Sequence, residues 1–329
     1  MNVALIGHGS IAEDHAWVLR ELAKDQNQPV TLRAVLGPEQ QAADEFARQH
    51  GALYATTDFD QVLNDEHIHA VIICSPSDMH AQQTERCLRA GKHVLCEIPL
   101  ALSLPETDRL LAIADQTDRR LMVCHTQRYW PSSREARRRV VHGELHPHAL
   151  TGRYLFKRRE NVNWKGRQRD WTDNLLWHHA CHAVDLAMWL LNAQAVSVTA
   201  QVALPSEPLG IPMDLTISLR TPRDQLATVV MSYNTHMALH DYLVIGEEDT
   251  LLVMERELCD QHGPLLLRSE HAPILQQDAE FFAAVREERE PEVSARAVRP
   301  AMAVLQAAQE HLDALLAQVG RDACHPRLP

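Results

Sequence analysis

The sequence has no apolar run long enough to cross a membrane, and residues 1–7 have neither the cationic region nor the long apolar region of a signal peptide. Its seven cysteines include no Cys-x-x-Cys pair and no even set that would form a disulfide framework. The formal net charge of −12 argues against a nucleic-acid partner, which usually requires a basic excess. We therefore expect a cytoplasmic protein with reduced thiols that binds neither nucleic acid nor membrane.

What the chain does have is length and apolar residues. Its 329 residues, 45% of them hydrophobic, are enough for two cores. In residues 1–124, short apolar segments alternate with helix-forming ones, which predicts an α/β domain with a doubly wound parallel sheet. In residues 125–329, longer alternating segments are joined by short turns, which predicts an α+β domain with an open, mostly antiparallel sheet. The strands of this sheet are expected at 149–157, 196–203, 214–220, 226–232, 241–246 and 250–254. We expect the C-terminal helix to pack back on the body.

The beginning of the chain predicts a strand, a glycine-rich turn and a helix. The turn has the G-x-G-x-x-A form of the dinucleotide-binding fingerprint and reads Gly7-His8-Gly9-Ser10-Ile11-Ala12. Gly7 permits the tight turn, Gly9 lets the backbone approach a pyrophosphate, and Ala12 allows the helix to pack closely on the strand. We therefore predict a Rossmann domain that binds a nicotinamide dinucleotide through this turn.

The end of the second predicted strand bears on the choice between NAD and NADP. NAD-binding proteins usually carry an acidic residue there for the adenosine ribose, whereas this chain has Leu36-Gly37-Pro38. Without that carboxylate nothing repels a 2′-phosphate, so NADP is somewhat favoured. No arginine stands directly there to hold the phosphate, so NAD stays an alternative.

Later strands of the first domain are followed by polar residues that should share one edge of the sheet. In open α/β sheets, ligands collect at the carboxyl ends of the strands. We predict that this edge contributes to cofactor binding, through residues that follow the strands at 70–74 and 93–96: Ser75, Pro76, His80, Glu97 and Ile98. His125 follows the strand at 121–124 at the same edge.

The segment from Trp177 to Leu186 carries three histidines and a carboxylate within two turns of a predicted helix. With about 100° of rotation per residue, His178, His182 and Asp185 fall in a narrow sector, whereas His179 lies in the adjacent apolar stripe. Because histidine exchanges a proton near neutral pH, His178 and His182 are candidates for acid–base chemistry. For His179, core packing and substrate contact stand as equal alternatives.

Several of these motifs together resemble the glucose–fructose oxidoreductase and inositol dehydrogenase family. They are the GxGxxA turn, Cys74-Ser75-Pro76 with His80, Glu97-Ile98-Pro99 and His182-x-x-Asp185, and the resemblance covers essentially the whole chain. Family members usually have a catalytic lysine within an E-K-P motif and an aspartate four residues before the helix histidine. Here Ile98 and His178 occupy those positions. The resemblance implies a dehydrogenase with His182 as the base and His178 sharing or relaying the proton.

Further segments look like one branch of that family: His125-Thr126-Gln127-Arg128, Arg158-Arg159-Glu160-Asn161, Trp171 to His182 and Leu209 to Asp214. Members of that branch use NADP to oxidise the cyclic hemiacetal of 4-carboxy-2-hydroxymuconate-6-semialdehyde to 2-pyrone-4,6-dicarboxylate, in protocatechuate 4,5-cleavage. The resemblance implies this reaction here. Because the substrate is a dicarboxylate, arginines should bind it. The expected substrate residues are Arg128 first, then Arg158 and Arg169, with His125, His179 and Trp171.

Three other functions stay open. A zinc enzyme could use His178 and His182, with His125 as a third ligand, although no glutamate completes a His-Glu-x-x-His motif. A non-catalytic dinucleotide sensor would be consistent with the missing lysine. A dehydrogenase of the same family could act on a sugar or cyclitol instead. The basic segment at 157–169 counts against this alternative. We predict no bound metal, and the resemblance implies a homodimer or homotetramer.

Overall fold

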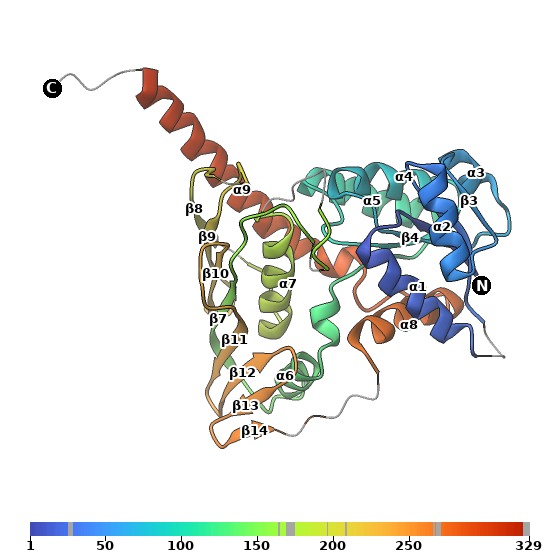
Figure 1. The fold of residues 1–329 in the computed structure, drawn as a ribbon. Coiled ribbons are helices and arrows are strands. Elements are labelled where there is room, and N and C mark those ends of the chain that lie inside the picture. The colour runs from blue at the N-terminus through green and yellow to red at the C-terminus, as the bar shows by residue number, and fades with distance from the viewer. Residues whose placement is uncertain are drawn as a thin grey trace. The chain divides into compact units, whose positions relative to one another are not determined.

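The computed structural model describes residues 1–25, 29–163, 165–168, 175–195, 197–207, 209–265, 267 and 271–324 (Figure 1). The chain forms two compact units. Unit 1 comprises Met1–Tyr129 and Glu270–Arg299, and unit 2 comprises Trp130–Ser269 and Pro300–Pro329. The sequence had placed all of residues 125–329 in the second domain, whereas residues 125–129 and 270–299 group with unit 1.

Unit 1 is built on a six-stranded parallel sheet with the order β3-β2-β1-β4-β5-β6. Its strands are β1 (Asn2–Ile6), β2 (Thr31–Leu36), β3 (Tyr54–Thr56), β4 (Ala70–Ile73), β5 (His93–Cys96) and β6 (Leu121–Val123). Every residue of β4 is buried, as expected for a parallel sheet covered on both faces. The order reverses between β1 and β4, which creates the switch point where such sheets bind ligands. The predicted doubly wound parallel sheet is confirmed.

The helices of unit 1 lie on both faces of this sheet (Figure 1). They are α1 (Ser10–Leu22), α2 (Gln40–His50), α3 (Phe59–Asn64), α4 (His80–Arg89), α5 (Leu104–Thr117) and α8 (Pro273–Arg286). Helix α5 has Ser103 as its N-cap: the Ser103 hydroxyl accepts from the Glu106 N–H at 3.3 Å and donates to the Glu106 carboxylate at 3.0 Å. Helix α8 packs against α1, and this contact joins a late segment of the chain to the first helix.

Unit 2 is built on an eight-stranded sheet with the order β14-β13-β12-β11-β7-β10-β9-β8. Its strands are β7 (Pro147–Leu155), β8 (Ser197–Val202), β9 (Asp214–Arg220), β10 (Leu226–Ser232), β11 (Leu239–Gly246), β12 (Thr250–Met254), β13 (Leu258–Asp260) and β14 (Gly263–Leu265). Strands β7 and β10 pair in parallel, and the other neighbours pair antiparallel. The predicted open, mostly antiparallel sheet is confirmed.

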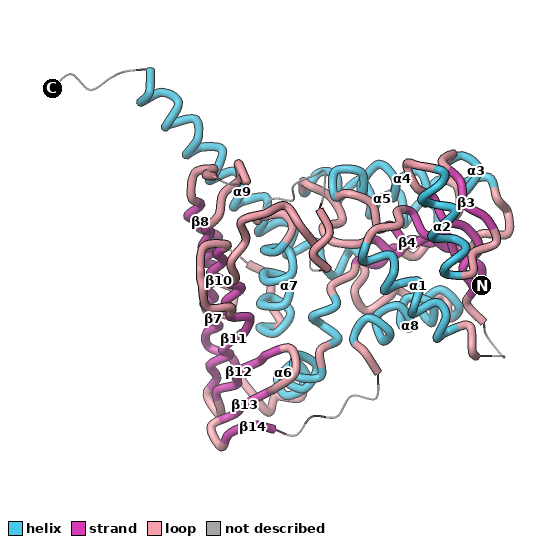
Figure 2. Tube along the Cα trace, in the orientation of Figure 1, coloured by secondary structure: helices cyan, strands magenta, loops and turns pink. Residues whose placement is uncertain are grey.

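Helices α6 (Pro131–Val141) and α7 (His179–Leu191) pack against this sheet (Figure 2). Ten of the thirteen residues of α7 are buried, so its apolar residues form much of the core of unit 2. The division between the units falls inside α9 (Ala295–Cys324), at Pro300. Within unit 2, the indole N–H of Trp177, just before α7, donates to the Gln309 side chain of α9 at 2.9 Å.

Helix α7 begins at His179, so His178 does not lie in the helix as the sequence had predicted. The Ala180 N–H donates to the Leu175 carbonyl, five residues back, which gives the preceding turn a wider geometry than an α-helix. Strands β3, β13 and β14 were not predicted, and each has only three residues. Across the described residues, no helix combines the length and the hydropathy needed to cross a membrane.

Candidate active site

The glycine-rich turn of unit 1 has the geometry that a pyrophosphate requires. Gly7 has a φ of +103°, and a Cβ there would lie 2.7 Å from the Cys74 carbonyl oxygen. A Cβ on Gly9 would meet nothing within 4 Å, so its surface is open to a ligand. Gly9 is also the N-cap of α1 and provides no side-chain cap. The first-turn N–H groups of a helix with such a cap suit a phosphate, so the turn fits a dinucleotide.

The residue after β2 is Gly37, and its lack of a side chain makes room for His8. A Cβ on Gly37 would come within 2.6 Å of His8 Cδ2. The imidazole of His8 therefore occupies the space that an acidic side chain would fill in a typical NAD-binding protein. Its ring centroid lies 6.3 Å from that of Phe46 on α2.

His80 is fully buried and ties together the loops that follow β4 and β5. Its Nδ1 lies 2.7 Å from the Pro99 carbonyl oxygen and its Nε2 lies 2.8 Å from that of Ser75. The Ser75 hydroxyl donates to the Gln83 side chain at 2.5 Å. Ile98, in the position where relatives have lysine, is buried as well. Any contribution of His80 to cofactor binding therefore acts through these two loops.

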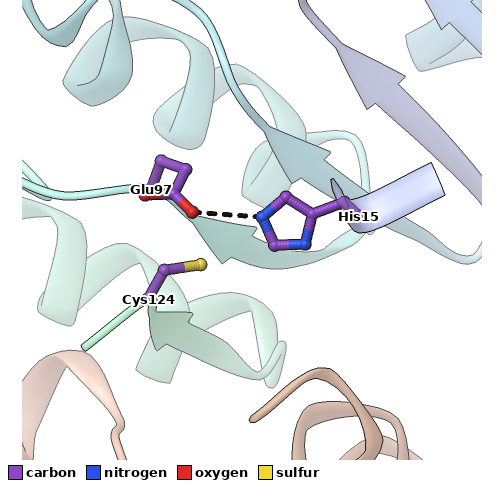
Figure 3. A group of neighbouring side chains, drawn as sticks. All are labelled: His15, Glu97 and Cys124. Atoms are coloured by element: carbon purple, nitrogen blue, oxygen red, sulfur yellow. Dashed lines mark hydrogen bonds and ion pairs between the residues drawn. The ribbon is translucent and has the colours of Figure 1, made fainter. Parts of the chain in front are cut away.

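A buried charged cluster lies at the same edge of the sheet. His15 of α1 has its Nδ1 2.6 Å from an Asp278 oxygen and its Nε2 3.1 Å from Glu97 Oε1. Figure 3 shows the His15 ring facing Glu97, with the thiol of Cys124 beside them. The second Glu97 oxygen accepts from the Ile98 N–H at 3.2 Å. The sequence had identified Glu97 as a crevice residue, but not its partners His15 and Asp278.

Both carboxylates stabilise a positive charge on His15. Burial by itself favours the neutral ring, but Asp278 and Glu97 outweigh burial and raise the pKa of His15 to about 10. Burial would raise the pKa of Glu97, but the hydrogen bond and the charge of His15 lower it. Glu97 is therefore an ionised carboxylate beside an imidazolium.

This cluster is also the one group of described residues with the spacing of metal ligands, since the ligand atoms of His15, Glu97 and Cys124 lie within 4.8 Å of one another. An imidazolium has no lone pair for a metal, and both ring nitrogens already face carboxylates. The arrangement therefore suits a proton shared with the His15 ring better than a metal ion. The zinc alternative had named His178 and His182, which are not in this group.

His125 and Arg128 are both buried in unit 1. His125 follows β6, and Arg128 lies in the short 3-10 helix Thr126–Tyr129. One Arg128 N–H donates to the Ala297 carbonyl at 3.4 Å. The Thr126 hydroxyl donates to Gln277 of α8 at 2.7 Å, which holds this segment against α8.

Unit 2 contains an open pocket of about 860 Å³. It is lined by the end of β7 with the segment that follows it, by the turn before α7 and by the start of β11. Three residues predicted from the sequence line it: His178, His179 and Arg158. Tyr154 and His240 line it as well and were missed.

Aromatic rings surround His179 in this pocket. His179 Nδ1 forms a short hydrogen bond with the Tyr233 hydroxyl. Its ring meets those of Tyr154 and Phe156 edge-on, with centroids 4.9 and 5.4 Å away, and that of His178 at 4.6 Å. Of the two alternatives for His179, the structure therefore places it at the pocket, although substrate contact stays a prediction.

His240 extends this aromatic lining. Its ring stacks on Tyr154 with centroids 4.0 Å apart and an interplanar angle of 12°. Burial lowers the pKa of His240 to about 4, so the ring is neutral near pH 7. The pocket thus offers a flat stacked pair of rings suited to a planar ligand.

Three cationic side chains line the same pocket: Lys157, Arg158 and Arg159. Arg158 is 7% exposed, donates to Asn161 at 3.0 Å and lies over the Tyr233 ring. Arg159 donates to the carbonyls of Arg158 and Tyr233, each at 2.8 Å. The only acidic residue in the lining is Glu160, so the pocket is cationic among the residues that the structure describes.

The remaining predicted residues are distributed differently. His182 lies on α7 and is half-buried, and it is not among the described residues that line the pocket. Asp185 is buried on the same helix. Arg169 and Trp171 lie outside the described residues.

Comparison with known proteins defines the class. Residues 1–125 match a family described as an oxidoreductase family with an NAD-binding Rossmann fold, and residues 131–267 match the C-terminal region of bacterial oxidoreductases. The chain is 34% identical to 4-carboxy-2-hydroxymuconate-6-semialdehyde dehydrogenase of Sphingobium sp. strain SYK-6, over 93% of this chain and 96% of that protein. The chain therefore belongs to this oxidoreductase family, and the resemblance found in the sequence is confirmed.

Other relatives share the family but not the substrate. The chain is 31% identical to inositol 2-dehydrogenase of Rhizobium meliloti strain 1021, over 61% of this chain and 58% of that one. A solved structure of levoglucosan dehydrogenase, in complex with NADH and levoglucosan, superposes with a TM-score of 0.83 at 20% identity. That superposition covers 94% of this chain and 96% of the other, and it shows the common fold.

Proposed function

We propose that this protein oxidises the cyclic hemiacetal of 4-carboxy-2-hydroxymuconate-6-semialdehyde to 2-pyrone-4,6-dicarboxylate. The observation that carries the proposal is the pocket of unit 2, which combines three cationic side chains with a stacked aromatic wall. A dicarboxylate with a planar ring fits both features. The similarity to the Sphingobium enzyme over nearly the whole chain supports the same substrate.

Oxidation of a hemiacetal requires the loss of a hydride from carbon and of a proton from the hydroxyl. A bound nicotinamide dinucleotide supplies the hydride acceptor. The family resemblance assigns the hydroxyl proton to His182, which lies one helical turn beyond the pocket residue His178, and His178 would share that proton or donate a hydrogen bond to the ring oxygen. A hemiacetal hydroxyl is more acidic than that of a simple alcohol, which accounts for activity with Ile98 in place of lysine.

We further propose that the cofactor is NADP. Gly37 replaces the acidic residue that would repel a 2′-phosphate, and the imidazole of His8 fills the vacated space. An imidazole N–H can donate to a phosphate oxygen, whereas a carboxylate there would favour the free ribose hydroxyls of NAD. NAD stays the alternative.

The test supplies the ring-cleavage product with NADP, and separately with NAD, and records the ultraviolet absorbance of the reduced nicotinamide. We expect reduction with NADP and formation of one lactone for each hydride transferred, which chromatography of the product measures. If neither cofactor is reduced, the proposed substrate is wrong.

A sugar or cyclitol is the second candidate substrate, favoured by the match to inositol 2-dehydrogenase. The same assay with inositols and with levoglucosan separates the two candidates. Turnover of a neutral polyol in preference to the dicarboxylate would contradict a role for Lys157, Arg158 and Arg159 in charge recognition. A sensor would reduce neither cofactor with any of these compounds.

A further inference from the structure

We infer that Asp278, His15 and Glu97 form a buried charge relay that keeps Glu97 ionised at the nicotinamide half of the sheet, so that the protein binds the oxidised cofactor in preference to the reduced one. His15 is a positioning residue in this arrangement and Asp278 supports it. The inference rests on the use of a nicotinamide dinucleotide and not on the substrate.

The geometry of the relay comes from three elements of unit 1. His15 lies on α1, Asp278 on α8, and Glu97 directly after β5. The His15 ring is completely buried and has a carboxylate oxygen at each nitrogen, at 2.6 and 3.1 Å. When both carboxylates are ionised, both contacts are hydrogen bonds only if the ring carries two hydrogens, which is the imidazolium form. Gln277 donates to the other oxygen of Asp278 at 3.1 Å and fixes its orientation.

Among the described residues, His15 forms the ion pair with the Glu97 carboxylate. The thiols of Cys74, Cys96 and Cys124 lie around the relay, and burial raises the pKa of each, so they stay neutral. Asp14 of α1 adds negative charge near Cys74. His80 of α4 also contributes to lowering the pKa of Glu97, although its ring nitrogens face two carbonyl oxygens rather than the carboxylate. With two carboxylates and one imidazolium, the relay itself carries a net negative charge.

The position of this charge in the fold suggests its effect. The glycine-rich turn after β1 and the end of β2 form the adenosine half of a Rossmann site, which leaves β4, β5 and β6 for the nicotinamide nucleotide. Glu97 is at the carboxyl end of β5 in that half. The nicotinamide ring is positive when oxidised and neutral when reduced, so a fixed carboxylate stabilises the oxidised form and leaves the reduced form nearly unaffected.

The first test measures the dissociation constants of oxidised and reduced NADP for the full chain without substrate, by calorimetry. Glu97→Gln keeps the shape of the side chain and removes its charge. We expect the oxidised form to bind about tenfold more weakly and the reduced form to change by less than about twofold. Equal weakening of both forms overturns the inference. Because no substrate is present, this result is independent of the proposed reaction.

The second test addresses His15. In His15→Gln, two carboxylates face a neutral amide, so one of them binds a proton near neutral pH. The preference for the oxidised form, constant from about pH 6 to about pH 9 in the wild type, should then increase with pH. Adding Asp278→Asn removes the competing carboxylate and should restore the preference at neutral pH. A constant preference in His15→Gln, or no recovery in the double variant, overturns the inference.

His93→Gln is the matched control. His93 starts β5, at the opposite end of the strand from Glu97, and accepts a hydrogen bond from the Arg120 N–H. Burial and two nearby arginines lower its pKa to about 4, so the substitution removes no cation. The ratio of the two dissociation constants should equal that of the wild type. If His15→Gln does not fold, Glu97→Gln with this control decides the inference by itself.

Discussion

The His15 imidazolium should make the stability of the protein depend on pH in a defined range. The pKa of His15 is raised from 6.5 to about 10 in the folded chain. A raised pKa contributes stability that is fully present below the unfolded value of 6.5 and is lost as the pH increases through about 10. At about 1.4 kcal/mol for each pH unit, this interval corresponds to a contribution on the order of 5 kcal/mol.

The appropriate comparison is the double variant His15→Gln with Asp278→Asn, which replaces the ionic pair by two neutral side chains of similar size. Urea unfolding of both proteins across this range gives the difference in the free energy of unfolding. We expect the advantage of the wild type to be largest at about pH 6 and to decrease by several kcal/mol towards pH 10. Two stability curves that run parallel across the range would refute a buried imidazolium.

Three further predictions concern the proposed reaction. His182→Ala should lower turnover by about two to four orders of magnitude, because it removes the base, and near-normal turnover would exclude that role. Arg159→Met should raise the KM for the dicarboxylate about tenfold or more, whereas Arg220→Met, an exposed arginine of β9, should leave it unchanged. Equal effects would exclude charge recognition at the pocket. Gly37→Asp should displace the His8 ring and raise the KM for NADP about tenfold relative to that for NAD; an unchanged KM ratio would contradict the cofactor proposal.

Local patterns in the sequence predicted most of the secondary structure. The strand, turn and helix at the beginning of unit 1 depend on a short apolar run followed by glycines, and β1 and α1 are where this pattern placed them. The strands at 214–220, 226–232 and 250–254 were predicted with their observed bounds, because alternation and flanking turn residues define them.

Contacts between distant segments could not be predicted in this way. Asp278 is 263 residues from His15 in the sequence, and no local periodicity indicates that their side chains meet. His15 itself looked like an ordinary residue of a helix. His240 was missed because the strand was expected to begin at Asp241, whereas β11 starts two residues earlier and carries this ring to the pocket.

The hydrogen bond from Trp177 to Gln309 makes the C-terminal helix relevant to protein engineering. The indole of Trp177 is buried directly before His178, and its partner lies more than a hundred residues later in α9. A shortened chain that ends before Gln309 would keep every predicted catalytic residue, yet it would lose this hydrogen bond and the buried side chain of Leu312. Affinity tags and fusion partners are therefore better attached beyond α9, and deletions in that helix should impair catalysis without touching a reacting group.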